Sequence, residues 1–162
     1  MTGSVTHATF CLERVYDAAP ARVFHAFTDP AARDRWFFKT DSWTRHRHAG
    51  GEAVVGAAES SAFSPPGADV VITNDSLYLD IVTNERLVFA YEMTVGGTRI
   101  SASLTTVELR PEGKGTRLVF TEQGAYFAGE GDNGLEGRIG GTRELLEALG
   151  AEIAREMTGA DQ

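Results

Sequence analysis

The chain is short of cysteine, lysine and long apolar runs. Cys11 is the single cysteine of 162 residues, so neither an intramolecular disulfide nor a cysteine-based metal cluster can form. Lys39 and Lys114 are the only lysines, and 15 basic residues against 23 acidic ones leave a formal charge of −8. Because nucleic-acid affinity depends on Lys and Arg that neutralise phosphates, this balance argues against a DNA or RNA partner.

No window approaches the roughly 20 apolar residues that a membrane-spanning helix needs. The N-terminal sequence MTGSVTHATF lacks the basic start and the apolar stretch of a secretion signal. We therefore expect a cytoplasmic protein with no membrane partner. The content of 42% hydrophobic and 23% charged residues is ordinary for a globular protein, and the length predicts one domain over residues 1–162 with its core at about 6–157.

The N-terminal quarter predicts one strand and two short helices. Residues 6–16 alternate loosely between apolar and polar side chains, which is typical of a strand. A proline at the first helical position opens the helix predicted over residues 20–28. Asp29 and Pro30 are a second start signal, an N-cap acceptor followed by proline, and they predict another short helix over residues 30–36.

Residues 43–123 alternate between strand patterns and breaks rich in glycine and proline. We expect five or six strands here, most clearly at residues 86–95, 98–110 and 116–123. Successive hairpins imply an antiparallel meander. The sequence therefore predicts a curved sheet of six or seven strands, counting residues 6–16.

The C-terminal residues form an amphipathic pattern to about residue 157, with apolar side chains at three- and four-residue steps. The first half of this pattern contains Gly134, Gly137, Gly140 and Gly141, and each glycine within a helix costs about 1 kcal/mol relative to alanine. Either the stable helix begins near Gly140, which we favour, or another segment approaches the helix backbone closely.

This order of elements predicts an α+β helix-grip fold. A sheet with one apolar face must cover that face, and the terminal helix is the only element long enough to do so. A twisted sheet and a straight helix do not mesh everywhere, so a concave apolar gap opens toward the two short helices. Such a gap is the default ligand site.

Five segments resemble the START-like (Bet v 1-like), or SRPBCC, superfamily, and within it the AHSA1-like family named for the activator of heat shock protein 90 ATPase. They are VYDAAPARVFHAFTDPAARDRWF, AGGEA, NERLVFAYEM, GTRLVFTEQGAYF and GGTRELLEALGAEI. The resemblance implies a helix-grip fold with a hydrophobic ligand pocket, and it implies no particular reaction. The family usually shows Gly-Trp where this chain has Gly141-Thr142, which implies a larger or more polar cavity here.

Two groups of residues are candidates for the site. The aromatic residues between the second short helix and the sheet, Trp36, Phe37, Phe38 and Trp43, belong either to the core or to a cavity mouth. A hairpin centred on residues 112–115, with Leu109 opposite Thr116, would also put hydroxyls and one carboxylate on the inner face of the sheet: Ser101, Ser103, Thr105 and Glu122.

These inner polar groups either bond one another or bind the polar end of a ligand, in which case Glu122 is the best candidate for acid–base chemistry. His46 and His48 could share one side of an extended segment, but two ligands are too few for a metal site. We expect no metal and no cofactor.

The leading hypothesis is therefore the binding of a small apolar molecule, aromatic or lipid-like, by a monomer or homodimer; a binding protein is favoured over an enzyme, and the sequence leaves open whether a reaction is catalysed. The alternative is an enzyme of the polyketide cyclase or dehydratase type that uses the same cavity, and the least favoured is a co-chaperone of heat shock protein 90. The candidate ligand-binding residues are Trp36, Phe37, Phe38, Trp43, Tyr78, Phe89, Tyr91, Met93, Ser101, Ser103, Phe120, Glu122, Thr142, Leu145, Leu146 and Leu149.

Overall fold

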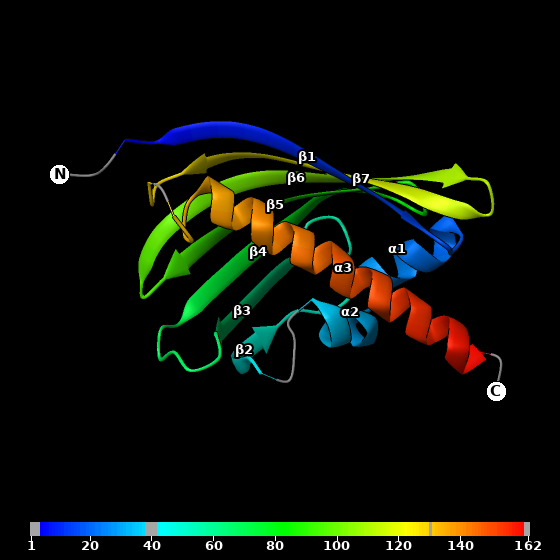
Figure 1. Cartoon of the computed structure of the whole chain (residues 1–162), viewed down its shortest axis with the longest axis horizontal. Coiled ribbons are helices and arrows are strands. Elements are labelled where there is room, and N and C mark those ends of the chain that lie inside the picture. Colours follow the sequence, from blue (N-terminus) through cyan, green and yellow to red (C-terminus); the bar gives the residue numbers. More distant parts are fainter. Residues whose placement is uncertain (1–3, 38–41, 130, 161–162) are drawn as a thin grey trace.

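Seven antiparallel strands curve around one long helix in the computed structural model, which describes residues 4–37, 42–129 and 131–160 (Figure 1). The strands are β1 (Thr6–Tyr16), β2 (Thr44–Ala49), β3 (Ala58–Ser64), β4 (Ile72–Val82), β5 (Arg86–Val95), β6 (Thr98–Glu112) and β7 (Gly115–Tyr126). The helices are α1 (Pro20–Thr28), α2 (Pro30–Trp36) and α3 (Leu135–Ala160). The predicted α+β helix-grip fold is confirmed.

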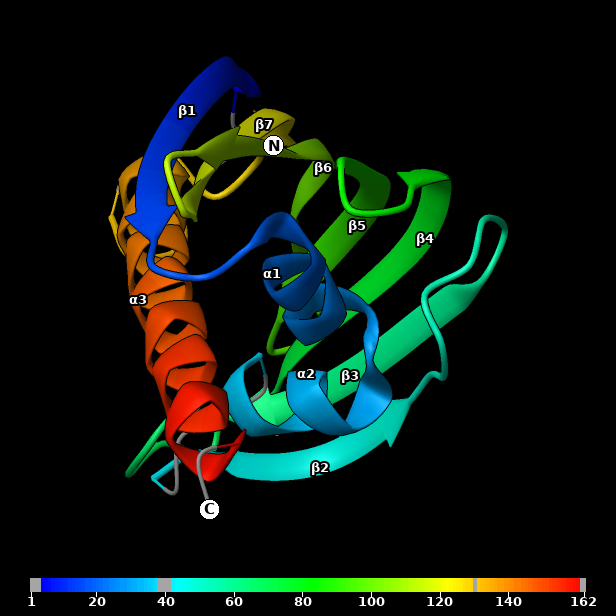
Figure 2. The ribbon, with the colours of Figure 1, turned by 90° about the vertical axis from the view of Figure 1, so that its right-hand side faces the viewer.

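The sheet has the order β1-β7-β6-β5-β4-β3-β2. Strands β2 to β7 form a meander, and the last of them, β7, pairs with every residue of the first strand of the chain, β1. Figure 2 shows the sheet curving from β1 round to β2, with α3 along its open side and α1 and α2 in front of it. Among the described residues, no helix is both long enough and apolar enough to cross a membrane.

The two short helices have the predicted bounds because their start signals are local. The Asp29 carboxylate accepts a hydrogen bond from the Ala32 backbone N–H at 2.9 Å, which caps α2. The Trp36 indole Nε1 donates to the Ala26 carbonyl oxygen at 2.7 Å and so ties α2 to α1. Val23, Ala26 and Phe27 of α1 are buried in the same core.

The hairpin of β6 and β7 differs from the predicted register by two residues. Leu109 lies opposite Leu118 and not opposite Thr116, and Glu112 pairs with Gly115. The reason is a two-residue turn whose first central residue, Gly113, has a φ of 59°, which glycine adopts without strain. Since side chains alternate with a period of two, the inner face still carries the predicted polar residues Ser101, Ser103, Thr105 and Glu122, all of them buried.

Helix α3 begins at Leu135, so the favoured prediction of a start near Gly140 is wrong. The other reading explains the first two glycines. A Cβ on Gly137 would lie 1.8 Å from the Asp132 carbonyl oxygen, and one on Gly134 would lie 2.2 Å from that of Gly129. The preceding loop therefore packs directly on the helix backbone at Gly137 and folds closely on itself at Gly134, and each separation excludes a side chain at that position.

Candidate functional site

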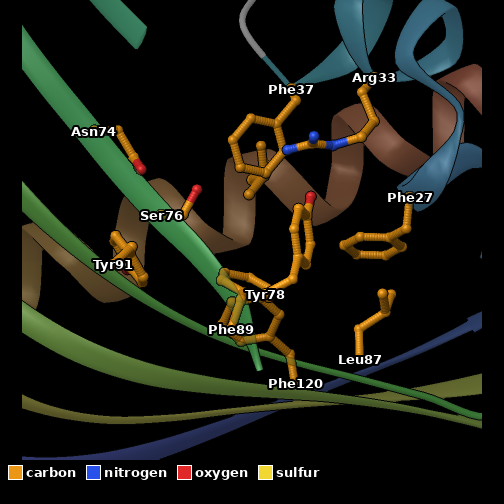
Figure 3. A pocket seen from close by; sticks show the side chains of 11 residues that line it. Phe27, Arg33, Phe37, Asn74, Ser76, Tyr78, Leu87, Phe89, Tyr91 and Phe120 are labelled. Atoms are coloured by element: carbon orange, nitrogen blue, oxygen red, sulfur yellow. The ribbon is translucent and has the colours of Figure 1, made fainter. Parts of the chain in front are cut away.

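Two adjoining cavities lie on the inner face of the sheet. The larger one, called the main cavity below, has a volume of about 340 Å³ and lies between the first half of α3 and strands β3 to β6. The smaller one, the inner cavity, has about 40 Å³ (Figure 3). Phe37, Asn74 and Leu145 line both cavities.

The wall of the main cavity is mostly apolar. Trp36 is 2% exposed and packs edge to face on Phe27 and Phe37, so it belongs to the core as well as to the wall. Trp43 is 37% exposed and contacts Phe63, with ring centroids 5.6 Å apart, which places it at the rim. The other apolar lining residues are Ile72, Met93, Val95, Ile100, Leu145 and Ala148.

The α3 side of the main cavity consists largely of small residues, with one arginine and one glutamate. Gly137 and Gly141 line it, and apart from the neighbouring residues and backbone of its own helix nothing lies within 4 Å of where a Cβ of Gly141 would be. The Thr142 hydroxyl donates to the Arg138 carbonyl oxygen at 2.9 Å. The threonine hydroxyl is therefore bonded to its own helix, and the polar side chains that α3 presents to the cavity are the nearly buried Arg138 and the exposed Glu144.

Glu122, beyond Arg138, is a fully buried carboxylate with four donors. Its Oε2 accepts from the Tyr126 hydroxyl at 2.6 Å, from the Ser103 hydroxyl at 3.1 Å and from Arg138 Nη1 at 3.1 Å. Its Oε1 accepts from the Tyr91 hydroxyl. We call these residues, together with Ser101, the Glu122 network.

Arg138 joins the Glu122 network to the main cavity. Its side chain is 9% exposed. Nη1 also donates to the Tyr91 hydroxyl oxygen at 2.9 Å, and Nη2 donates to the Ser101 hydroxyl oxygen at 2.5 Å. The guanidinium carbon lies 5.3 Å from the Tyr91 ring centroid and 5.5 Å from that of Tyr126. Among the described residues, the hydrogen bonds of the guanidinium come from Nη1 and Nη2 and none from Nε, and the Arg138 side chain lines the main cavity.

The tyrosines of the network stay protonated over a wide pH range. Burial first, and then the negative charge of Glu122, raise the pKa of Tyr91 well above its ordinary value. Burial and the hydrogen bond to Glu122 likewise raise the pKa of Tyr126. Both hydroxyls therefore remain donors to the Glu122 carboxylate.

A second buried ion pair lies beside the inner cavity, whose lining includes Arg33. The Arg33 guanidinium bonds the Glu59 carboxylate, and their side chains are 6% and 5% exposed. Arg33 also lies over the Phe37 ring, 4.8 Å from its centroid. Figure 3 shows Asn74 and Ser76 projecting from β4 into this region.

The cavities bring together ten of the sixteen predicted binding residues. Six of them line the main cavity: Trp36, Phe37, Trp43, Met93, Thr142 and Leu145. Phe37 and Leu145 line the inner cavity as well. Four line only the inner cavity: Tyr78, Phe89, Tyr91 and Phe120.

Five of the other six predicted residues line neither cavity. Leu146 and Leu149 are fully buried in the core. Ser101, Ser103 and Glu122 belong to the Glu122 network behind Arg138 and Tyr91. Phe38 lies outside the described residues.

Sequence reasoning missed Arg138, Asn74 and Tyr126. A signal for Arg138 was present, because helical spacing puts it in line with Thr142 and the buried Leu146 and Leu149. His46 shares a hydrogen bond with the Ser64 hydroxyl at 2.7 Å. Within the described part of the chain, no three His, Cys, Asp or Glu side chains gather as a metal site would need.

A curved sheet that grips a helix over an apolar cavity defines the START-like, or SRPBCC, class of domains. The sequence model described as "Activator of Hsp90 ATPase homolog 1-like protein" matches residues 17–154, and the chain belongs to that family. A search of curated proteins found no match.

Solved structures resemble the chain over nearly its whole length. The Mll3558 protein from Rhizobium loti is 47% identical, with a TM-score of 0.82 over 93% of this chain and 99% of that one. A protein from Rhizobium leguminosarum is 38% identical, with a TM-score of 0.85 over 94% and 97%. CalU16 from Micromonospora echinospora, 21% identical with a TM-score of 0.60 over 96% and 90%, shares the fold.

Proposed function

We propose that this protein binds a small, mostly apolar molecule in the main cavity, with a hydrogen-bond acceptor of the ligand directed at Arg138. One observation carries the proposal. The nearly buried Arg138 side chain lines a largely apolar cavity, and its Nε lacks a hydrogen-bond partner among the described residues. Hydrogen bonds from a charged donor are roughly twice as strong as neutral ones, so an acceptor placed there contributes both affinity and orientation.

The size of the main cavity supports a ligand of one or two rings. Its volume of about 340 Å³ is at the lower end of the roughly 300–1,000 Å³ that is typical of small-molecule sites. Aromatic and aliphatic side chains from α2, the sheet and α3 supply the apolar contact, and Trp43 at the rim is exposed enough to meet an entering ligand.

A reaction catalysed directly by Glu122 has less support. The carboxylate is 0% exposed, lines neither cavity and already accepts from four donors. A general acid or base must come within hydrogen-bond reach of the proton that it transfers, and Arg138 and Tyr91 stand between Glu122 and the cavities. We therefore propose that Glu122 holds Arg138 in place. Action on heat shock protein 90, which the family description mentions, has no observation in its favour here.

The test uses prodan, an uncharged naphthalene ketone whose fluorescence shifts to the blue in apolar surroundings. Gly141→Leu is the blocking variant, because Gly141 lines the main cavity with open space where its side chain would be. Gly140→Leu is the matched control, since this neighbouring position also has open space but does not line the cavity.

We expect saturable prodan binding to the wild-type protein with a blue-shifted emission. Leucine at position 141 should weaken it by about tenfold or more, which corresponds to a loss of about 1.4 kcal/mol. The Gly140→Leu variant should bind like the wild type, and both variants should keep the native far-UV circular dichroism. Equal weakening by the two variants, or no binding of prodan at all, would refute the proposal.

A further inference from the structure

We infer that the main cavity selects uncharged ligands over anionic ones of the same shape, and that Glu122 sets this selectivity. The inference rests on the proposed function and narrows its ligand class to neutral apolar molecules that carry an acceptor such as a ketone, ester or amide carbonyl. An arginine in an apolar cavity would ordinarily indicate a carboxylate ligand. The surroundings of Arg138 point the other way.

The first observation is that the charge of Arg138 is already compensated. Its Nη1 lies 3.1 Å from Glu122 Oε2, and the two side chains are 9% and 0% exposed. Charges this close and this well shielded from water interact strongly. A ligand therefore meets a guanidinium whose positive charge is balanced, although its N–H groups still donate hydrogen bonds.

The second observation concerns the remaining charges on the cavity wall. Among the described residues that line the main cavity, Arg138 carries the only positive charge, whereas Asp132 and Glu144 are both acidic. The whole chain carries a formal charge of −8. A carboxylate that enters the cavity would meet these two acidic side chains on the wall. It would also meet a third carboxylate, Glu122, which lies behind Arg138.

An uncharged acceptor avoids both the repulsion by these carboxylates and the loss of hydration that a charged group suffers. A carbonyl oxygen accepts from the free Nε–H of Arg138 without bringing a second negative charge next to Glu122. It also loses far less hydration than a carboxylate on entering an apolar site. Glu122 is thus a specificity-determining residue that acts through Arg138 and does not itself touch the ligand.

The experiment compares methyl 2-naphthoate with 2-naphthoate as competitors of prodan, at about pH 8, where the acid is fully ionised. For the wild-type protein we expect the ester to bind at least about tenfold more tightly than the anion. Since an ester enters any apolar site more easily than an anion, the decisive measurement is the ratio of the two affinities in Glu122→Gln. This variant keeps the size of the side chain and leaves Arg138 uncompensated.

In Glu122→Gln the preference for the ester should fall by about tenfold or more, through tighter binding of the anion. The matched control is Glu136→Gln, which makes the same change in net charge at an exposed residue that does not line the cavity, and it should keep the wild-type ratio. Arg138→Gln, which leaves Glu122 without its cation, should weaken the anion further than the ester. If Glu122→Gln does not fold, the wild-type protein still tests the inference, because tighter binding of the anion than of the ester would overturn it.

The outcomes separate the two proposals. If prodan does not bind to the wild-type protein, the proposed function fails and this inference fails with it. If prodan binds but the ester-to-anion ratio is unchanged in folded Glu122→Gln, or the wild-type protein prefers the anion, the inference alone is overturned.

Discussion

The tyrosines provide a sensitive test of how the inner face of the sheet is buried. All four tyrosines of the chain have a raised pKa, and burial is the largest cause in each case. For Tyr78, burial raises the pKa from 10.0 to about 12. We therefore predict that no tyrosine of the folded protein ionises near pH 10.

The sign of the effect on stability follows from proton linkage. Unfolded tyrosines lose their protons near pH 10, whereas the folded ones retain them to higher pH, so above pH 10 the unfolded state binds fewer protons. The stabilisation is complete below the unfolded pKa and is lost as the pH rises toward the folded values. At about pH 11 each such tyrosine has lowered the free energy of unfolding by roughly 1.4 kcal/mol, and all four together by about 5 to 6 kcal/mol.

A loss of this size equals the stability of many small domains, so alkaline unfolding should occur between about pH 11 and 12. The assay is a titration followed by phenolate absorbance at about 295 nm together with far-UV circular dichroism. Phenolate absorbance should stay flat through pH 10 and then rise with the loss of the dichroism, while the protein in guanidinium chloride titrates near pH 10. Ionisation of three or more tyrosines near pH 10 with the dichroism intact would refute the burial of the Glu122 network, because Tyr91 or Tyr126 would then be among them.

Three further predictions concern stability, measured by urea unfolding. Thr105 is fully buried, and its Oγ1 has no hydrogen-bond partner among the described residues. Thr105→Val should therefore raise the free energy of unfolding by about 1 kcal/mol. A loss of stability would show that the hydroxyl does have a partner. Gly140→Ala should gain up to about 1 kcal/mol because open space surrounds its Cβ position. Gly137→Ala should instead destabilise the fold, because its Cβ would meet the Asp132 carbonyl oxygen. Equal effects of the two glycine variants would contradict the packing of the loop on α3.

Elements with local signals could be predicted from the sequence. The proline and Asp29 signals gave both short helices their correct bounds, since capping depends on neighbouring residues alone. The β6–β7 register was wrong by two residues because a turn rich in glycine allows more than one centre. The start of α3 was wrong because helix propensity counts glycines as a cost, whereas Gly134 and Gly137 are required by the backbone of the adjacent loop.

The candidate site could be predicted only on its sheet side. Alternation along β6 and β7 put Ser103 and Glu122 on the inner face, and a shift by two residues leaves such an assignment intact. Arg138 was missed because a charged residue on a helix is usually solvated. Its burial depends on Glu122, which lies on a strand and has no sequence pattern that links it to α3.

The residues that flank Arg138 explain why a cavity exists at all. Gly137 is small because the loop packs on it, whereas Gly141 has open space where its side chain would be, so packing does not account for that glycine. Thr142 stands where the family resemblance would place a tryptophan, and its hydroxyl is bonded back to the Arg138 carbonyl. Of the two consequences that this departure could have, a larger cavity or a more polar one, the geometry favours the larger, with Arg138 as the polar group that its occupant meets.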